Sequence, residues 1–133
     1  CFSGKYTENE VKKKLVGKGG AVAYFGTNDI REIVARAQDG DSECDRFLKG
    51  FAVSVAKYIG SLATVVGGKV DAIILTGGIA HSKPIVDDII DRVGFIAPVE
   101  VYAGENELES LAENGYGILA GEFDIKYYHP DHF

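Results

Sequence analysis

The chain has 133 residues, and its 14 lysines and arginines against 20 aspartates and glutamates give a net charge of −6. This length allows one domain or part of one. Hydrophobic residues make up 46% and charged residues 26%, which excludes a disordered or collagen-like chain. The longest nearly apolar stretch, residues 47–66, contains Lys49 and Lys57, which argues against a membrane span. With two cysteines and no secretory leader pattern, we expect a reducing cytoplasm.

The charge is distributed unevenly along the chain. Residues 1–66 carry ten basic and eight acidic side chains, whereas residues 67–133 carry four and twelve. An acidic half repels phosphate backbones, so nucleic acid is not an expected partner. Because the chain opens on Cys1 rather than methionine, we expect a piece of a longer protein.

Three elements are predicted in the first forty residues. Apolar positions spaced four apart predict a short helix over residues 6–16. The apolar run at residues 21–25, which glycines precede and follow, predicts a short buried strand. Thr27, Asn28 and Asp29 are residues that cap helices, and helical spacing of apolar residues follows them over residues 30–37.

A long helix is predicted next, with Asp41 and Ser42 as candidate caps, because its apolar positions from Phe47 to Val66 follow the 3.6-residue period throughout. Its apolar arc is wider than packing against one sheet face needs. We therefore expect this helix to be buried, with a second packing surface against the rest of the protein or a partner subunit.

The second half of the chain alternates strand and helix. Residues 70–76 predict a strand covered on both faces, and an amphipathic helix follows over residues 84–93. A second strand over residues 99–103 leads through residues 104–107 into a last helix whose apolar positions run from Leu108 to Leu119. This order predicts an α/β fold with a right-handed βαβα unit and parallel strands. Residues 123–133 show no packing pattern and are expected to form a tail.

Glycine-rich turns follow both predicted strands. In a parallel sheet, ligands bind beyond the carboxyl ends of the strands. Gly77 and Gly78, which follow the first strand, allow backbone N–H groups and a helix N-terminus to approach a phosphate or an adenosine. The alternative is an ordinary strand-to-helix turn, because paired glycines are common in such turns.

Five segments, in this order and at this spacing, resemble the butyrate kinases: Cys1-Phe2-Ser3-Gly4-Lys5-Tyr6, Gly17-Lys18-Gly19-Gly20, Gly26-Thr27-Asn28-Asp29-Ile30-Arg31, Leu75-Thr76-Gly77-Gly78-Ile79-Ala80 and Gly104-Glu105-Asn106-Glu107. Butyrate kinases are similar to acetate kinases and belong to the superfamily of acetate and sugar kinases, heat-shock ATPases and actin. The resemblance implies a partial ribonuclease-H-like domain, the C-terminal part of such an enzyme. The family's phosphate-binding hairpins, catalytic histidine and acyl-binding arginine are then expected upstream of Cys1.

The resemblance also implies site residues. The family's adenosine motif corresponds to Thr76, Gly77, Gly78, Ile79 and Ala80, whose glycines would pack against ATP or ADP. Arg31 corresponds to an active-site arginine that steadies the phosphoryl group during transfer. The alternative for Arg31 is a solvent-facing side chain, although a cation at a helix N-terminus opposes the macrodipole.

The resemblance also implies a metal ligand, and three further features of the sequence carry less weight. Glu107 resembles the glutamate that helps to hold Mg²⁺ in acetate kinase, with helix capping as the alternative and Glu105 and Glu109 as other candidates. His81 is expected to be a surface residue, and Lys83 is a candidate phosphate contact. No role is assigned to the tail residues His129, Asp131 and His132.

The implied activity is phosphoryl transfer between ATP and the carboxylate of a short-chain fatty acid, which gives an acyl phosphate and ADP reversibly. Residues 1–122 would belong to the nucleotide-binding domain, and without the upstream groups they would be inactive. The full-length enzyme would be a homodimer. An alternative is that this piece is a dimerisation module, because the predicted long helix carries surplus apolar surface.

Overall fold

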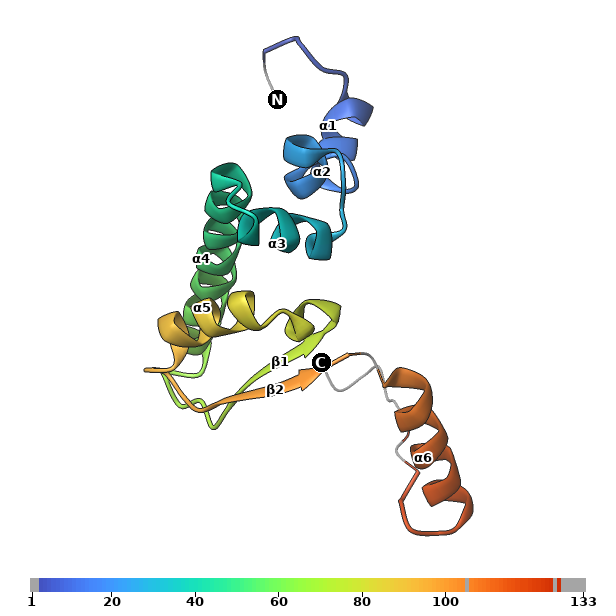
Figure 1. Ribbon diagram of the computed structural model, residues 1–133. Helices are drawn as coiled ribbons and strands as arrows, with labels where there is room; N and C mark the ends of the chain where they lie inside the picture. Colours follow the sequence, from blue (N-terminus) through green and yellow to red (C-terminus); the bar gives the residue numbers. More distant parts are fainter. Residues whose placement is uncertain (1–2, 105, 126, 128–133) are drawn as a thin grey trace.

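The computed structural model describes residues 3–104, 106–125 and 127, which form six α-helices, one 3-10 helix and two strands (Figure 1). Cys1, Phe2, Glu105 and the tail residues His129, Asp131 and His132 lie outside the described residues. No described helix meets the length and apolarity that a membrane crossing requires. In chain order the elements are α1 (Glu8–Leu15), α2 (Gly20–Phe25), α3 (Ile30–Gln38), α4 (Ser42–Val65), β1 (Ile73–Gly77), the 3-10 helix η1 (Gly78–His81), α5 (Lys83–Val93), β2 (Val99–Ala103) and α6 (Glu107–Leu119).

The two strands pair in parallel, as the alternation of strand and helix predicts. Ile73 lies opposite Val99, and the register continues to Gly77 opposite Ala103. The bounds of β2 agree with the prediction, whereas β1 begins three residues later than expected and ends one residue later. The α/β class and the parallel βαβα order are therefore confirmed.

The core lies between α4, α5 and one face of the sheet. Helix α5 buries four residues of one stripe, Ile85, Val86, Ile89 and Val93. Most of this stripe joins Ala52 of α4 and Ile73 of β1 in one hydrophobic cluster. The amphipathic pattern of α5 thus fixes how the helix lies on the sheet.

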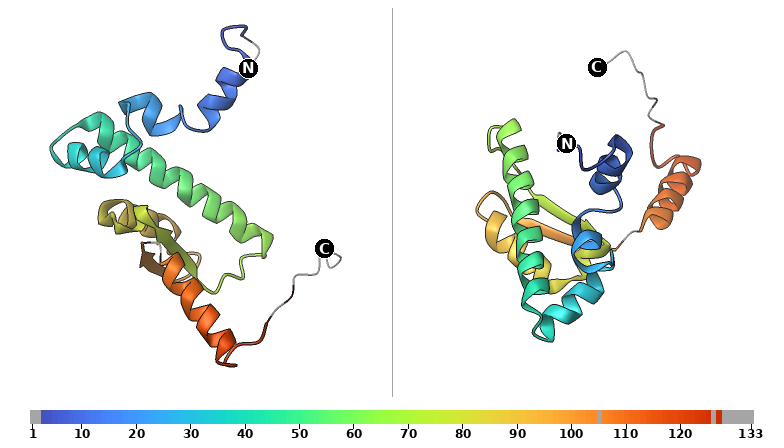
Figure 2. Two further views of the ribbon diagram at one scale, coloured as in Figure 1. Left: turned by 90° about the vertical axis from the view of Figure 1, so that its right-hand side faces the viewer. Right: turned by 90° about the horizontal axis from the view of Figure 1, so that it is seen from above.

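The other face of the sheet is open in the described part of the chain. Ile74 and Tyr102, which point away from the core, are each 63% exposed. The prediction that the first strand is covered on both faces is wrong for these residues, because α4 and α5 lie on the same side and α6 leads away from them (Figures 1 and 2).

The predicted strand at residues 21–25 is wrong, because these residues belong to α2. A lone strand without a neighbour would leave its backbone N–H and C=O groups unpaired, whereas a helix pairs them internally. Gly26 ends the helix in the left-handed conformation, and its N–H donates to the carbonyl of Val22. Phe25 packs edge-on against Phe47 of α4, with ring centroids 5.2 Å apart.

Helix α4 is as long as predicted, but it is not buried over its length. Its fully buried residues are Cys44 and Ala52. Helices α3 and α5 pack against it, so Tyr58, Leu62 and Val65 stay exposed along the described chain. The prediction of a long buried helix is therefore wrong for this structure, whereas its surplus apolar surface is present.

Candidate functional site

The turns that follow β1 and β2 lie against each other at one edge of the sheet. The N–H of Gly77 donates to the carbonyl of Gly104 at 3.2 Å, and the N–H of Gly104 donates to the carbonyl of Gly77 at 3.1 Å. The Thr76 hydroxyl donates to the same Gly104 carbonyl at 3.5 Å. The carboxyl ends of the two strands thus form one platform, as expected for parallel neighbours.

Gly77, the last residue of β1, and Gly78, the residue that follows it, have different roles. Gly77 has φ +82° and ψ −177°, a backbone region that is open essentially to glycine alone. Gly78 has no such φ, and a Cβ atom built on it would meet no heavy atom within 4 Å. The fold therefore requires glycine at position 77, whereas the missing side chain at position 78 leaves open space in front of the turn.

That space is part of an open cavity of about 1160 Å³ between the start of α3 and the turn after β1. The cavity brings Arg31 together with Gly78 and Ile79, although Arg31 precedes both the glycine and the isoleucine by 47 positions or more in the sequence. Thr76 and Gly77 are not among its lining residues, and both bond to Gly104 of the neighbouring turn. Ala80 is buried in the protein. The remaining lining residues are Asn28, Asp29, Ile30, Val34, Ala35, Gln38, His81, Ser82, Lys83 and Pro84.

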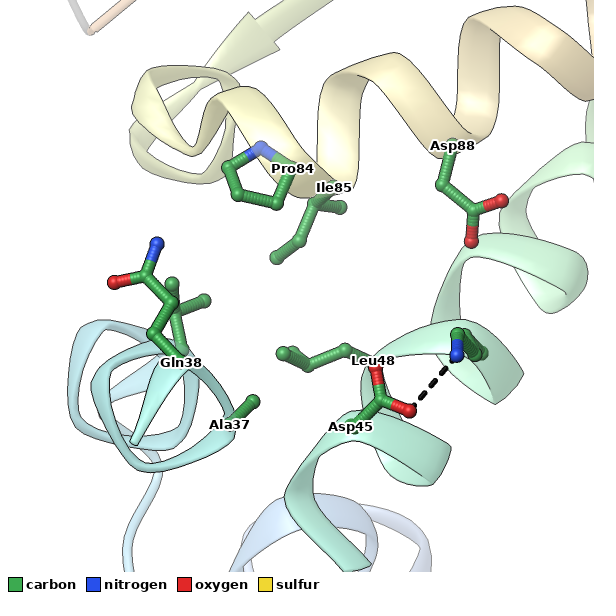
Figure 3. A pocket seen from close by; sticks show the side chains of 9 residues that line it. Ala37, Gln38, Asp45, Leu48, Pro84, Ile85 and Asp88 are labelled. Carbon is green, nitrogen blue, oxygen red and sulfur yellow. Dashed lines mark hydrogen bonds and ion pairs between the residues drawn. The ribbon is translucent and has the colours of Figure 1, made fainter. Parts of the chain in front are cut away.

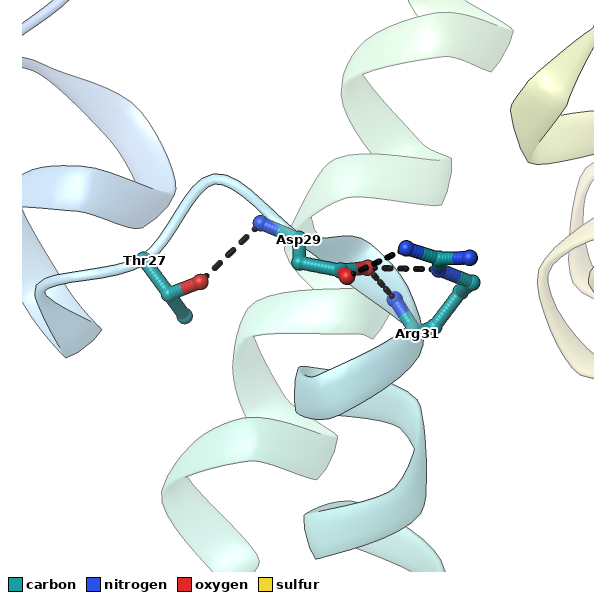
Figure 4. Close-up of polar contacts among 3 residues, drawn as sticks. All are labelled: Thr27, Asp29 and Arg31. Carbon is teal, nitrogen blue, oxygen red and sulfur yellow. Dashed lines mark hydrogen bonds and ion pairs between the residues drawn. The ribbon is translucent and has the colours of Figure 1, made fainter.

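Arg31 is held by Asp29, the residue that caps α3. The carboxylate of Asp29 accepts the Arg31 backbone N–H at 2.9 Å, its Nε at 2.9 Å and its Nη2 at 2.7 Å (Figure 4). These bonds from Arg31 lower the pKa of Asp29 to about 2. The Arg31 side chain is still 92% exposed, so its guanidinium is oriented but open to an incoming anion.

Lys83 and His81, the weaker candidates from the sequence, also line the cavity. The Lys83 ammonium forms hydrogen bonds with both carboxylate oxygens of Asp87, at 2.9 and 2.6 Å. The imidazole of His81 lies beside Gly104, where an added Cβ would come within 3.3 Å of Nε2. Lys83 is therefore partly neutralised, and His81 helps to fill the platform between the two turns.

Glu107 is the first residue of α6 and is not among the residues that line the cavity. Across residues 3–104, 106–125 and 127, no three His, Cys, Asp or Glu side chains gather as a metal cluster would. Mg²⁺, however, is often held by one or two carboxylates together with substrate phosphates. An exposed carboxylate three residues beyond Gly104 fits a single ligand of that kind.

A smaller cavity of about 300 Å³ adjoins the large one between α3, α4 and α5 (Figure 3). The two cavities share Val34, Gln38 and Pro84. The sequence did not predict that Gln38 and Val34 line a cavity. The signal that could have found them is helical spacing, because positions 34 and 38 follow Arg31 by one and two turns.

Comparison with known proteins finds relatives that match nearly the whole chain. The chain is 52% identical over 128 residues to butyrate kinase 1 of Clostridium acetobutylicum, and 49% identical over 128 residues to probable butyrate kinase 2 of Caldanaerobacter subterraneus subsp. tengcongensis. Each match covers 96% of this chain and 36% of the relative. The chain therefore spans about a third of the length of these curated relatives.

A crystal structure of a propionate kinase from Francisella tularensis subsp. tularensis has the same fold over 80% of this chain and 33% of its own, with a TM-score of 0.68 and 24% identity. The family model described as the Acetokinase family matches residues 3–116. This match extends over most of the chain and includes both turns of the platform and the segment that carries Arg31. The chain belongs to the Acetokinase family.

Proposed function

We propose that this chain is the C-terminal, nucleotide-binding portion of a cytoplasmic butyrate kinase, in a ribonuclease-H-like domain that includes residues 1–122. The enzyme transfers a phosphoryl group reversibly between ATP and a short-chain fatty acid, so that butanoate and ATP give butanoyl phosphate and ADP. Identity of 45–52% to butyrate kinases supports this substrate class. The 36% share of the relatives' length supports a role as one portion of the enzyme.

One observation carries the proposal: a single open cavity joins the Gly78–Ile79 turn to Arg31. The adenosine of ATP or ADP would lie against Gly78 and Ile79, because a Cβ built on Gly78 would meet no heavy atom within 4 Å. Thr76, Gly77 and Ala80 would set the shape of that wall. Arg31 on the opposite side would then lie toward the phosphates.

Arg31 is suited to act on the phosphoryl group in flight. Asp29 engages Nε and Nη2, which leaves Nη1 for an anion. Because a planar guanidinium fixed in direction need not reorganise when charge develops, it can stabilise the transition state more than the ground state. Phosphoryl transfer depends mainly on such positioning and charge neutralisation.

The reaction also needs Mg²⁺, for which Glu107 is the proposed ligand in this chain. The metal, when bound, would neutralise charge on the phosphate oxygens. The Glu107 carboxylate would hold the metal from the start of α6, and the neighbouring Glu109 and Glu105 are alternatives, the latter outside the described residues.

The test is an assay of the full-length kinase that carries this chain. The purified enzyme is incubated with ATP, Mg²⁺ and butyrate, and the acyl phosphate is trapped with hydroxylamine as a hydroxamate. We expect hydroxamate with butyrate and less with acetate. Absence of hydroxamate with butyrate and with isobutyrate, from a folded enzyme, would rule the proposal out.

A second function, assembly of a homodimer, is favoured by the exposed Tyr58, Leu62 and Val65 of α4. Contiguous apolar surface of this kind is typical of interfaces. Light scattering with and without ADP separates the two functions, because an assembly module stays dimeric whether or not the nucleotide binds. A monomeric mass under both conditions would exclude the module.

A further inference from the structure

The cavity is also lined by Gln38, whose amide has no role in phosphate binding. Gln38 is the last residue of α3 and lines both neighbouring cavities. Figure 3 shows its amide directed from α3 toward Pro84 at the start of α5. The side chain is exposed and makes no hydrogen bond with any other described residue. Its donor and its acceptor are both available to a ligand.

The position of Gln38 relative to Arg31 matches the length of a nucleotide. The two positions are seven residues apart along α3, which is nearly two helical turns, so both side chains project from the same face of the helix about 10 Å apart. This is the scale of the separation between the edge of a base and the phosphates of an extended nucleotide. A nucleotide whose phosphate chain points toward Arg31, with the transferring phosphoryl group rather than the ADP phosphates in contact with it, therefore brings its base toward Gln38.

The wall between these two ends suits a flat base. Val34 and Ala35 lie between Arg31 and Gln38 on α3, and Ile79 and Pro84 line the opposite side. All four are apolar, so they can contact the faces of a base but cannot distinguish one base from another. Recognition of the base therefore depends on a polar group at the edge of this slot.

We propose that Gln38 reads the edge of the base and makes this site selective for adenine. An amide side chain can accept a hydrogen bond from the adenine N6 amino group and donate one to N7. Hypoxanthine and guanine present two acceptors there, O6 and N7, so one of the two bonds is lost. This inference rests on the proposed function, which supplies the nucleotide and its direction in the cavity.

The test compares ADP with IDP, in which hypoxanthine replaces adenine and the rest of the molecule is unchanged. Dissociation constants are measured by calorimetry on the full-length kinase and its variants. The wild-type enzyme should prefer ADP at least about tenfold, within the range for one bidentate pair. Gln38→Leu should reduce this preference to about twofold or less, mainly by weakening ADP, because leucine keeps the bulk without the hydrogen bonds.

Two further variants make the result specific. Gln38→Glu should weaken IDP binding beyond the wild-type value, because a carboxylate can only accept and would face two acceptors. Glu32→Gln is the matched control, because Glu32 is an exposed residue of α3 that does not line the cavity. It should leave both dissociation constants unchanged.

The two proposals fail in different ways. A wild-type enzyme that binds ADP but not more tightly than IDP, or a folded Gln38→Leu variant that keeps its preference, overturns the role of Gln38 alone. A folded wild-type enzyme that binds neither nucleotide overturns the proposed function. If Gln38→Leu does not fold, the response of Gln38→Glu to IDP decides the question.

Discussion

Replacement of Gly78 by valine should impair nucleotide binding while the fold remains intact. The backbone at Gly78 does not adopt a positive φ, and an added Cβ would meet nothing within 4 Å. A side chain at this position therefore brings no strain from a positive φ, and its Cβ does not clash with the protein itself. Any loss of ADP affinity in this variant reports on the space in front of the turn.

The magnitude follows from the geometry of contact. An adenosine packed against the Gly78 Cα at van der Waals distance would overlap with a Cβ built about 1.5 Å farther out. Overpacking of this kind typically costs about 1–3 kcal/mol. We therefore expect the ADP dissociation constant to rise at least about tenfold, or roughly 1.4 kcal/mol.

The assay is calorimetric titration of the full-length kinase with ADP, with a thermal melt of each variant. Gly60→Val is the control, because Gly60 also has open space around its Cβ but lies on α4, away from the cavity. It should bind ADP as the wild type does. Unchanged ADP affinity in a folded Gly78→Val variant would mean that the turn has only a structural role.

The other predictions concern the neighbouring residues and the chain as a whole. Arg31→Ala should lower kcat by about two to three orders of magnitude and leave ADP affinity nearly unchanged, and Arg31→Lys should restore little, because an ammonium does not form a bidentate fork; retention of more than about a third of kcat would make Arg31 a surface residue. Gly77→Ala should lower the melting temperature with or without ADP, since its backbone conformation costs other residues on the order of 1–3 kcal/mol; an unchanged melting temperature would contradict the strain. The Asp29 carboxyl should titrate near pH 2, so its stabilising contribution is complete above about pH 3.8 and disappears as the pH falls through 2; in Arg31→Ala an NMR titration should show its pKa closer to 3.8, and no change would refute the pairing. The isolated chain should release no butyrate-dependent ADP, and turnover above a control without protein would contradict this.

The sequence was most informative for features that depend on a local pattern of side chains. The predicted stripe of Ile85, Val86, Ile89, Ile90 and Val93 can be buried in one way only, and the structure buries all of these residues except Ile90, which is half-buried. Asp29 was expected to cap a helix, and it caps α3. In both cases the information is local: a period in one helix, or a capping side chain at its start.

Where a prediction depended on distant neighbours, the sequence was insufficient. The apolar run of α2 fits a strand or a helix equally well, and the lack of a paired strand in the described sheet decides for the helix. The same holds for the cavity. That Arg31 and Gly78 line one space depends on the packing of α3 and α5 against α4, which no spacing in the sequence encodes.

The two-stranded sheet also affects how this chain can be handled alone. In the described residues, β1 and β2 each pair along one edge, and the face that carries Ile74 and Tyr102 is uncovered. Free strand edges beside apolar surface are templates for strand addition by other molecules. Recovery of the isolated chain during refolding should therefore decline as its concentration rises, and a solubilising fusion partner should improve the yield.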